Sequence, residues 1–460
     1  MSVRFLFTTL QFEETDGYAR VGAELERLGH DVAHLVASRA AARALRARGI
    51  AAALLPDRLT GLGPLDYETE VRRIEHEYPI PSLRDVWISD PVCRGRGERW
   101  CLERTVRHVV ALERLFAELR PDVVIPEVGS ETVRTVAHLV AGRSGATRFF
   151  VFFTIFPRPL RLGRDDYDAP IVPSKEVREL GPEERAEVEA FVDAYIRRDR
   201  PTLAHRRPRI TPAKLRDFAR HNLVKLTLDR DNEYLHPLRF VRAHAAQRAR
   251  SAAIARLYEP VPDTRPFVYF PLHVTDDFKV KRVIPHCVDQ GYLVEQIADA
   301  LPQGFDLVLK EHPVSLGRNS VGFLRRLVRR PNVRLVDAYT SSHELIRRAR
   351  AVAVISSTVG LEALLHGQPV LTIGRPFYSG YGVTLDVESF RELREAVPAL
   401  LRYRPDRERT LRFLHAAMRS TYEGAPAGVD RSEENGRRLA RSLDRAARDA
   451  VPVAAHPALP

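Results

Sequence analysis

Apolar residues alternate along the first part of the chain between short continuous runs and runs with a helical spacing. Residues 3–9, 31–37 and 50–56 are short apolar runs, while residues 16–30 and 39–49 carry apolar positions three or four apart. The first kind of run is typical of buried strands and the second of amphipathic helices. The pattern therefore predicts a β-α-β-α-β unit with a parallel sheet.

The same alternation continues further along. Residues 101–119 predict a helix, residues 122–142 a strand, a turn and a helix, and residues 148–156 another buried strand. Residues 57–100 are rich in charge and turn residues and predict no clear element. Residues 180–260 are mainly helical in pattern.

The stretch "EPVPDTRP" at 259–266 interrupts the helical pattern and marks a domain boundary, because proline removes a backbone donor and breaks a helix. A second strand–helix series follows. Its predicted strands are 267–273, 306–313, 333–337, 351–357 and 369–374, and its predicted helices are 290–302, 321–330, 341–350 and 358–367.

Together these patterns predict an α/β protein with two Rossmann-type, doubly wound domains that face a cleft, as in the GT-B architecture. The expected segments are an acceptor domain (1–179), a helical connector (180–260), a nucleotide-sugar domain (261–390), C-terminal helices (391–447) and a disordered tail (448–460). Nucleotide-sugar glycosyltransferases are common on this architecture, which sets an expectation without establishing an activity.

Composition limits the classes of partner. The net charge is +12, with 72 Lys and Arg against 60 Asp and Glu, which favours anionic partners. The basic runs have helical spacing, and RNA-binding aromatic motifs and zinc-finger spacings are absent from the sequence, so we expect no nucleic-acid partner. Three scattered cysteines form no disulfide framework, which fits a reducing compartment.

Polar residues follow the first strand of the second series. His273 ends that apolar run, and Asp276 and Asp277 come just after it. One of these carboxylates could act as a nucleophile or a base. The alternative is a turn or helix cap, which adjacent aspartates commonly form.

The next strand ends in "KEHP". Pro313 cannot donate to the sheet and keeps His312 extended, while Lys310 adds a positive charge. A lysine and a histidine at a strand end can hold a phosphate. The alternative is an ordinary surface turn.

A run of hydroxyl residues lies between a later strand and its helix. Ser356, Ser357 and Thr358 can combine with the backbone N–H groups of the helix start to form an anion site. Gly360 would let a ligand approach the first turn, and Glu362 would reach a ribose hydroxyl or complement the helix dipole. The alternative is a simple helix cap.

Because these three strand ends belong to one predicted sheet, one shared site is favoured over three unrelated turns. The chain has no Walker loop and no glycine-rich dinucleotide loop, which disfavours kinases, GTPases and dehydrogenases.

The segments "VYFPLHVTDD", "LVLKEHP" and "ISSTVGLEALLHGQPVLTIGRPFYSGYGVT" resemble bacterial capsule polysaccharide biosynthesis proteins, specifically the retaining β-Kdo glycosyltransferases that use CMP-Kdo. The resemblance spans about residues 267–390 and is weak over 1–260. It implies that His312 and the 356–358 hydroxyls hold the cytidine monophosphate, with Lys310 adding charge, and that Asp277, or else Asp276, is the nucleophile.

The resemblance also has consequences for neighbouring positions. His273 stands where the family usually has a glutamine, which is a departure. Tyr378, Gly380 and Tyr381 of "FYSGYG" match a loop expected to line the donor sugar. We expect no metal and no cofactor beyond the CMP-linked nucleotide-sugar donor.

The acceptor is expected at the first domain. Glu127 lies in the predicted turn "PEVGSE" and is the candidate base, with a dipole-complementing carboxylate as the alternative. A second acidic loop, "GRDDYDAP" (163–170), has no assigned role. We expect a glycan or glycolipid acceptor and a cytoplasmic protein, with peripheral contact to an anionic membrane surface.

Two other hypotheses stay open. The chain could use the same architecture as a UDP-sugar transferase, a UDP-sugar 2-epimerase or a CDP-polyol phosphotransferase. It could also be a non-catalytic partner in capsule assembly. Preference for CMP, UDP or CDP would separate the enzyme hypotheses.

Overall fold

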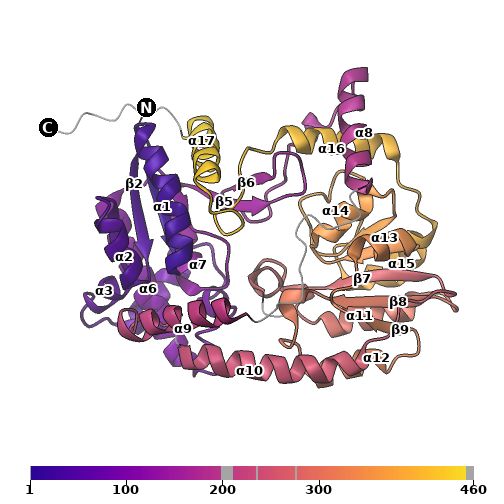
Figure 1. Ribbon diagram of the computed structural model, residues 1–460, viewed down its shortest axis with the longest axis horizontal. Coiled ribbons are helices and arrows are strands. Elements are labelled where there is room, and N and C mark those ends of the chain that lie inside the picture. The colour runs from indigo at the N-terminus through magenta and orange to yellow at the C-terminus, as the bar shows by residue number, and fades with distance from the viewer. Residues whose placement is uncertain (1, 198–210, 235–236, 275–276, 452–460) are drawn as a thin grey trace. The chain divides into compact units, whose positions relative to one another are not determined.

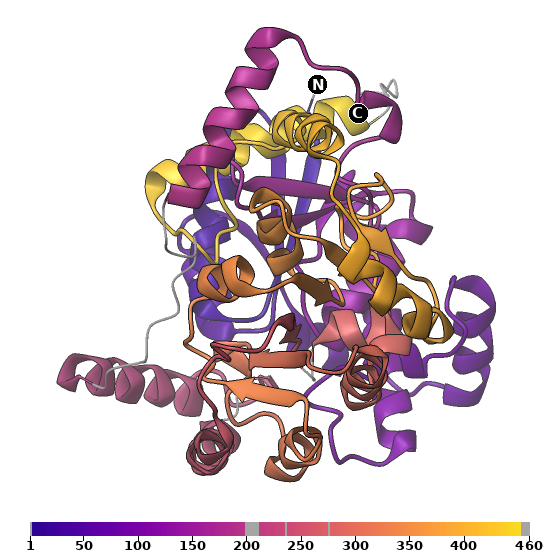
Figure 2. The ribbon, with the colours of Figure 1, turned by 90° about the vertical axis from the view of Figure 1, so that its right-hand side faces the viewer.

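Two six-stranded sheets organise the chain, one in each of two units (Figure 1 and, turned by 90°, Figure 2). The computed structural model describes residues 2–197, 211–234, 237–274 and 277–451. The first unit consists of Met1–Ala169, Thr211–Pro237 and Thr421–Pro460, and the second of Pro170–Ile210 and Leu238–Ser420. The fold class of two Rossmann-like α/β domains is therefore confirmed.

The first sheet has the strand order β3-β2-β1-β4-β5-β6. Adjacent strands of this sheet pair in parallel, except that β5 and β6 pair in antiparallel orientation. The strands are β1 (Arg4–Thr9), β2 (Asp31–Val36), β3 (Ala51–Leu54), β4 (Val123–Ile125), β5 (Thr147–Phe153) and β6 (Leu160–Arg164).

The helices of this unit come from the same three parts of the chain as the unit itself. They are α1 (Phe12–Arg27), α2 (Arg39–Arg46), α3 (Leu55–Thr60), α4 (Tyr67–Glu77), α5 (Arg84–Trp87), α6 (Glu98–Leu119), α7 (Thr132–Arg143), α9 (Pro212–Thr227) and α17 (Glu433–Ala450). Residues 57–100, which predicted no clear element, thus hold α4, α5 and most of α3. The end of the chain returns to this unit, where Leu439 and Leu443 of α17 are buried with Tyr18 and Leu25 of α1.

The second sheet is all parallel, with the order β12-β11-β10-β7-β8-β9. Its strands are β7 (Phe267–Leu272), β8 (Asp306–Glu311), β9 (Val333–Val336), β10 (Ala351–Val354), β11 (Val370–Thr372) and β12 (Leu385–Asp386). Counted from β7, this is the strand order 3-2-1-4-5-6 of the dinucleotide-binding fold, read in reverse. All six residues of β7 and of β8 are buried, as expected for central strands.

The helices of the second unit are α8 (Pro182–Arg197), α10 (Pro237–Ile254), α11 (Gln290–Ala300), α12 (Val321–Val328), α13 (Ser342–Arg348), α14 (Thr358–Leu365), α15 (Leu393–Arg402) and α16 (Arg407–Arg419). Short 3₁₀ or π turns occur at Ser174–Glu176, Ala255–Leu257, Lys279–Val283, Pro285–Cys287, Pro313–Ser315 and Phe390–Glu392. Side chains of Ser320, Ser341 and Ser357 accept backbone N–H groups at the starts of α12, α13 and α14, which fixes where these helices begin.

The units divide the chain differently from the predicted segments. The expected connector is shared between the units, because α9 belongs to the first and α8 and α10 to the second. Similarly, α15 and α16 stay with the second unit while α17 joins the first. Residues 448–450, expected in the disordered tail, complete α17, and the tail from 452 onward lies outside the described residues.

Candidate functional site

The carboxyl ends of β10, β7 and β8 are neighbours in the second sheet. This placement confirms that the three polar strand ends identified in the sequence meet at one edge. The direction of the strand order reverses between β7 and β10, and ligands of such sheets bind outside the carboxyl ends at this reversal. His273 and Ser356 are the polar residues next to it.

A hydrogen bond joins the two sides of the reversal. The backbone N–H of Ser356 donates to Nε2 of His273 at 3.2 Å, so the proton of the neutral imidazole must be on Nδ1. Gln290 holds the His273 backbone on both sides, since its Oε1 accepts the His273 N–H at 2.8 Å and its Nε2 donates to the His273 carbonyl at 3.2 Å. Burial, aided by the charges of Lys279 and His312, lowers the pKa of His273 to about 4.

The start of α14 offers donors toward the same edge. The side chain of Ser357 caps the helix by accepting the Val359 N–H at 3.2 Å, and Thr358 is exposed. The Oγ atom of Ser356 is buried and has no hydrogen-bond partner among the residues that the structure describes. A buried hydroxyl that lacks a partner is costly unless a ligand or water satisfies it. This end of α14 is therefore suited to bind an anion.

Gly360 and Tyr378 pack against each other at the start of α14. Tyr378 is fully buried, and its hydroxyl donates to the Ser357 carbonyl. A Cβ atom on Gly360 would lie 2.8 Å from Cζ of Tyr378, so the glycine makes room for this ring. The predicted approach of a nucleotide to Gly360 stays a prediction. Tyr378 thus supports the first turn of α14 from inside the unit, and its predicted contact with the donor sugar stays a prediction.

His312 adopts the extended backbone that Pro313 imposes, with φ −69° and ψ 137°. Its Nδ1 accepts the Val314 N–H at 3.2 Å, which places the proton of the neutral ring on Nε2. The side chain is exposed at the end of β8, beside β7. Pro313 begins the short turn Pro313–Ser315, which carries the chain away from the sheet as predicted.

Lys310 points toward α13. Its Nζ donates to the Thr340 carbonyl at 2.9 Å and to the Ser342 hydroxyl at 2.7 Å. Glu362 of α14 is also buried, and its Oε2 lies 3.8 Å from Nε2 of His343. Burial lowers the pKa of Lys310 to about 8 and raises the pKa of Glu362 to about 7, while their opposite charges partly offset both shifts.

Glu362 therefore has His343 and Lys310 of its own unit as neighbours. Its predicted contact with a ribose stays a prediction. The neighbouring Glu311 faces the other way, as its position in the strand requires. Its Oε1 accepts from Asn319 at 2.7 Å, and it is fully buried.

Asp277 caps a turn. Its Oδ1 accepts the Lys279 N–H at 2.9 Å at the start of the π turn Lys279–Val283, which agrees with the cap alternative. Burial raises the pKa of Asp277, and the charges of Lys279 and Arg318 act in the opposite direction. Lys279 thus acts on both Asp277 and His273, which puts the two in one neighbourhood. Asp276 lies outside the described residues.

The remaining residues of "FYSGYG" also hold the unit together. The Tyr381 hydroxyl donates to the Val172 carbonyl at 2.6 Å, and its ring lies 4.7 Å from that of Phe413. Gly380 has a φ of +83°, and its N–H donates to Asp386 at 2.8 Å. Both residues fix the loop that follows β11, while their predicted contact with the donor sugar stays a prediction.

In the first unit, Glu127 follows β4 at the reversal of strand order between β1 and β4. It has a left-handed φ of +59°, a strained conformation for a residue with a side chain. The Tyr18 hydroxyl donates to its Oε1, and the Val128 N–H donates to its Oε2 at 3.1 Å. Burial and the nearby Glu14 carboxylate raise the pKa of Glu127.

Arg134 of α7 faces three carboxylates at this point. It bonds Glu14 at 2.6 Å and lies 3.5 Å from Glu131, and its charge also acts on Glu127. Burial raises the pKa of Glu131 as well. We call Glu14, Tyr18, Glu127, Glu131 and Arg134 the Glu127 cluster. One cation thus faces three carboxylates in this cluster, and the role of Glu127 as a base stays a prediction.

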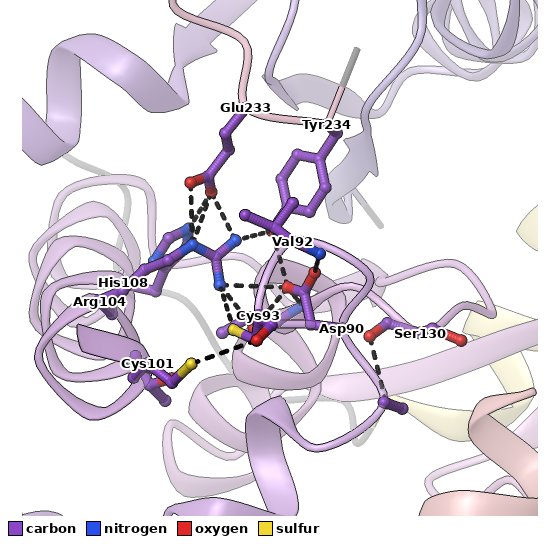
Figure 3. A network of polar contacts seen from close by, with 12 residues as sticks. Asp90, Val92, Cys93, Cys101, Arg104, His108, Ser130, Glu233 and Tyr234 are labelled. Atoms are coloured by element: carbon purple, nitrogen blue, oxygen red, sulfur yellow. Dashed lines mark hydrogen bonds and ion pairs between the residues drawn. The ribbon is translucent and has the colours of Figure 1, made fainter. Parts of the chain in front are cut away.

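A second buried network, which the sequence analysis missed, fixes the rest of this edge (Figure 3). Arg104 bonds Asp90 at 3.1 Å, Tyr234 at 2.7 Å and both oxygens of Glu233. Burial raises the pKa of Glu233, but the hydrogen bonds and charges of His108 and Arg104 outweigh this effect and lower that pKa to about 2. Glu233 and Tyr234 are more than a hundred positions from Arg104, so no local spacing could have signalled these partners.

Separate hydrogen bonds hold Asp229 and Asn232 at the ends of β2 and β1. Asp229 accepts from the Ser38 hydroxyl at 2.7 Å and from the Ala40 N–H at 3.1 Å, at the start of α2. Asn232 donates to the Leu10 carbonyl at 3.4 Å. The chain's own carboxylate thus occupies this helix start, where a Rossmann-like domain could otherwise hold an anion.

Comparison with known proteins gives a family match. Residues 198–419 match the family model described as capsule polysaccharide biosynthesis protein, which confirms the expected resemblance. Protein FixF of Sinorhizobium fredii is 33% identical over 161 residues, which cover 35% of this chain and 39% of FixF. The capsule polysaccharide modification protein LipA of Neisseria meningitidis is 36% identical over 81 residues, 18% of this chain and 12% of LipA.

The chain thus spans less than half the length of these two curated relatives. Among solved structures, the KpsC beta Kdo 2,4 transferase of Thermosulfurimonas dismutans is similar, with a TM-score of 0.39 and 16% identity over 65% of this chain and 79% of that one. Within the described ranges, no helix combines the length and the apolar character that crossing a bilayer requires.

Proposed function

We propose that this chain, which matches the family of capsule polysaccharide biosynthesis proteins over residues 198–419, is a glycosyltransferase that uses a CMP-activated sugar. The observation that carries the proposal is the pairing of His273 with Ser356 at the strand reversal, beside a helix start with a buried hydroxyl that lacks a described partner. A nucleotide phosphate supplies the negative charge that this edge is suited to hold.

The phosphate of CMP would lie against the N-terminus of α14. There it can accept hydrogen bonds from the Ser356 hydroxyl and from the first N–H groups of the helix. His312 carries its neutral-ring proton on Nε2, the nitrogen that would donate to a phosphate oxygen. Lys310 would contribute positive potential from within the sheet. These donors stabilise the leaving phosphate without a proton transfer to it.

The sugar would be transferred in two displacements. A carboxylate oxygen of Asp277 forms a bond with the anomeric carbon, and the bond from that carbon to CMP breaks, with the electron pair leaving on the phosphate. The acceptor hydroxyl then attacks the same carbon, its proton passes to a base, and Asp277 leaves as a carboxylate. Two inversions give net retention. Glu127, with its raised pKa, is the candidate base.

The donor sugar is proposed to be Kdo or a related ulosonic acid, and the acceptor a surface glycan or glycolipid. The names of similar proteins support this choice, since they include capsule modification and Kdo transfer. A UDP-sugar 2-epimerase is the second candidate, because the solved structures with a similar fold include UDP-GlcNAc 2-epimerases.

Thermal unfolding with added nucleotide tests the proposal. A ligand that binds only the native state raises the melting temperature, and a concentration of 100 times Kd stabilises by about 2.7 kcal/mol. CMP should raise the melting temperature more than UDP or CDP at equal concentration. A larger shift with UDP would contradict the CMP assignment and favour the epimerase.

A further inference from the structure

A hollow in the second unit has no part in the proposed reaction. Its volume is about 580 Å³, within the range of about 300–1,000 Å³ that small-molecule sites occupy. Its walls are the turn Pro285–Cys287, the start of α11, and the turn Phe390–Glu392 with the start of α15. We call it the α11–α15 hollow, and its lining includes His286, Tyr292, Gln296, Phe390, Arg391 and Arg394.

The hollow lies at the carboxyl edge of the second sheet, on one of its faces. Nε2 of His286 donates to the carbonyl of Ile373, the residue after β11, at 3.4 Å. Phe270 of β7 shares a core cluster with residues of α11 and α15, whereas the charge of Glu362 of α14 acts on the adjacent Tyr269. Since successive strand residues point to opposite faces, α14 covers the other face. The hollow is therefore distinct from the anion site proposed at the start of α14.

Three aromatic rings form one wall of the α11–α15 hollow. The ring centroid of Phe390 lies 5.9 Å from that of His286 and 5.8 Å from that of Tyr292. Phe390 packs against the core of the unit, while Tyr292 is 43% exposed. The wall is thus anchored in the fold and offers apolar surface to a ligand.

Hydrogen-bonding groups lie beside this wall. Gln296 is one helical turn beyond Tyr292 on α11 and therefore on the same face. No described residue bonds the amide of Gln296 or the hydroxyl of Tyr292. Because Nε2 of His286 donates to Ile373, Nδ1 of the neutral ring remains an acceptor. A sugar ring has apolar C–H faces and hydroxyls at its edge, so an aromatic wall beside such polar groups suits it.

Two arginines give the hollow positive charge. Arg391 and Arg394 are three positions apart, about one turn, so they lie on the same side of their segment. Both are exposed, and neither guanidinium pairs with a residue in the described ranges. The carboxylate in the lining, Glu388, bonds Arg375 at 3.1 Å. Guanidinium groups recognise carboxylates and phosphates through paired N–H donors, so these two indicate an anionic ligand.

From these features we infer that the α11–α15 hollow binds a sugar that carries an anionic group, either a carboxylate or a phosphate. The ring would lie against Tyr292 and Phe390, and its hydroxyls would bond Gln296. The anionic group would pair with Arg391 and Arg394. The aromatic wall and the two arginines together select for a charged sugar over a neutral sugar and over a small inorganic anion.

Binding of such a sugar does not depend on the nucleotide, whereas its identity as an acidic unit of the glycan acceptor rests on the proposed function. A glycan that carries acidic units would gain a second contact here, at the same edge of the sheet as the proposed CMP site. Two linked contacts favour a long acceptor over a short one, because the second contact forms at a high effective concentration.

A ligand-observed NMR titration of the full chain provides the test, with glucuronic acid, glucose 6-phosphate and glucose as probes. The three share one ring and differ only at carbon 6, which carries a carboxylate, a phosphate ester or a hydroxyl. We expect at least one of the anionic sugars to bind about tenfold more tightly than glucose. The tighter of the two identifies the anionic group that the hollow prefers.

Variants assign the binding to the hollow. Arg391→Gln/Arg394→Gln should bind the preferred anionic sugar about tenfold more weakly and glucose as before. Arg325→Gln/Arg329→Gln is the matched control, because it removes two exposed positive charges at α12, outside the hollow, and it should bind like wild type. Tyr292→Ala should weaken binding of all three probes, since it removes part of the aromatic wall. Melting temperature shows that the variants fold.

Equal affinity for glucose and both anionic sugars, or wild-type affinity of the Arg391→Gln/Arg394→Gln variant, would overturn the inference. Competitive displacement of the anionic sugar by CMP would overturn it too, because the hollow would then belong to the nucleotide site. The CMP-induced thermal shift should be the same in all variants of the hollow. If CMP causes no shift while the anionic sugar binds at Arg391 and Arg394, the proposed function fails and this inference stands.

Discussion

Nε2 of His273 accepts the backbone N–H of Ser356 at 3.2 Å, across the reversal of strand order in the second sheet. The bond exists only while the imidazole is neutral, and burial, with help from Lys279 and His312, lowers the pKa of His273 to about 4. The end of β7 and the start of α14 are therefore held in register at neutral pH by a group that acid would disrupt.

This bond leads to a prediction for His273→Gln. An amide oxygen can replace Nε2 as the acceptor but does not titrate. Between pH 6.5 and 4 the unfolded wild type binds a proton at this histidine that the folded state excludes, so stability falls as pH falls. The variant should lose about 1.4 kcal/mol less per pH unit in that window, measured by urea unfolding.

The control for that series is His76→Gln, at an exposed position of α4. It makes the same exchange of an imidazole for an amide at a position outside the bond between His273 and Ser356. If His273→Gln unfolds with the wild-type dependence on pH, the pKa of His273 is not lowered in the folded state.

The packing of Tyr378 on Gly360 predicts a cost for a single methyl group. In Gly360→Ala the new Cβ would lie 2.8 Å from Cζ of Tyr378, so we expect a loss of about 1–3 kcal/mol in the free energy of unfolding. Gly322→Ala is the control, because a Cβ there meets nothing within 4 Å, and alanine favours the helix. It should be neutral or stabilising by up to about 1 kcal/mol.

Tyr378→Phe removes the hydroxyl that the new methyl group would meet. It should cost about 1 kcal/mol alone, through the lost bond to the Ser357 carbonyl, and should partly relieve the cost of Gly360→Ala. Strict additivity of the two changes would contradict the contact.

The pKa of Glu362, raised to about 7 by burial and lowered in part by Lys310, predicts the opposite dependence on pH from His273. The folded state keeps a proton at Glu362 that the unfolded state loses from about pH 4.5 upward, so stability falls as pH rises toward 7. Glu362→Gln stays neutral and should gain stability relative to wild type between pH 5 and pH 8, measured by urea unfolding. A constant difference between the two proteins over this range would show that Glu362 does not titrate there.

Glu127→Gln separates transfer from nucleotide binding. Removal of one of three neighbouring carboxylates should not destabilise the first unit, because the pKa of Glu127 is raised there, whereas sugar transfer should be lost because the proposed base is gone. The CMP-induced thermal shift should remain, since the proposed CMP site is in the second unit. Glu131→Gln removes the same charge from the Glu127 cluster and is the control that should keep transfer. Loss of transfer in both variants would assign the effect to the charge of the cluster.

The pattern of apolar runs predicted the fold class and the polar strand ends, because both follow from the local alternation of strands and helices. It did not give the strand order, which depends on long-range pairing and which brings β10, β7 and β8 together. Nor did it show that Lys310 turns toward Ser342, since a strand-end side chain can face either its crevice or the helix that covers the sheet.

The packing of Tyr378 against Gly360 could not be predicted for a related reason. A tyrosine in a glycine-rich loop is typical of a ligand-contacting segment, yet Gly360, eighteen positions earlier, leaves a space that its ring fills. The network of Asp90, Arg104 and Glu233 joins segments with no shared motif, and only the folded chain reveals it.

Mass spectrometry of the chain mixed with CMP-Kdo tests the central claim most directly. The account predicts a covalent sugar on the peptide that contains Asp277, with release of CMP, and its absence in Asp277→Asn. The Asp277→Asn protein should still show the CMP-induced thermal shift. A sugar bound to another residue, or consumption of UDP-N-acetylglucosamine while CMP-Kdo stays intact, would contradict the account.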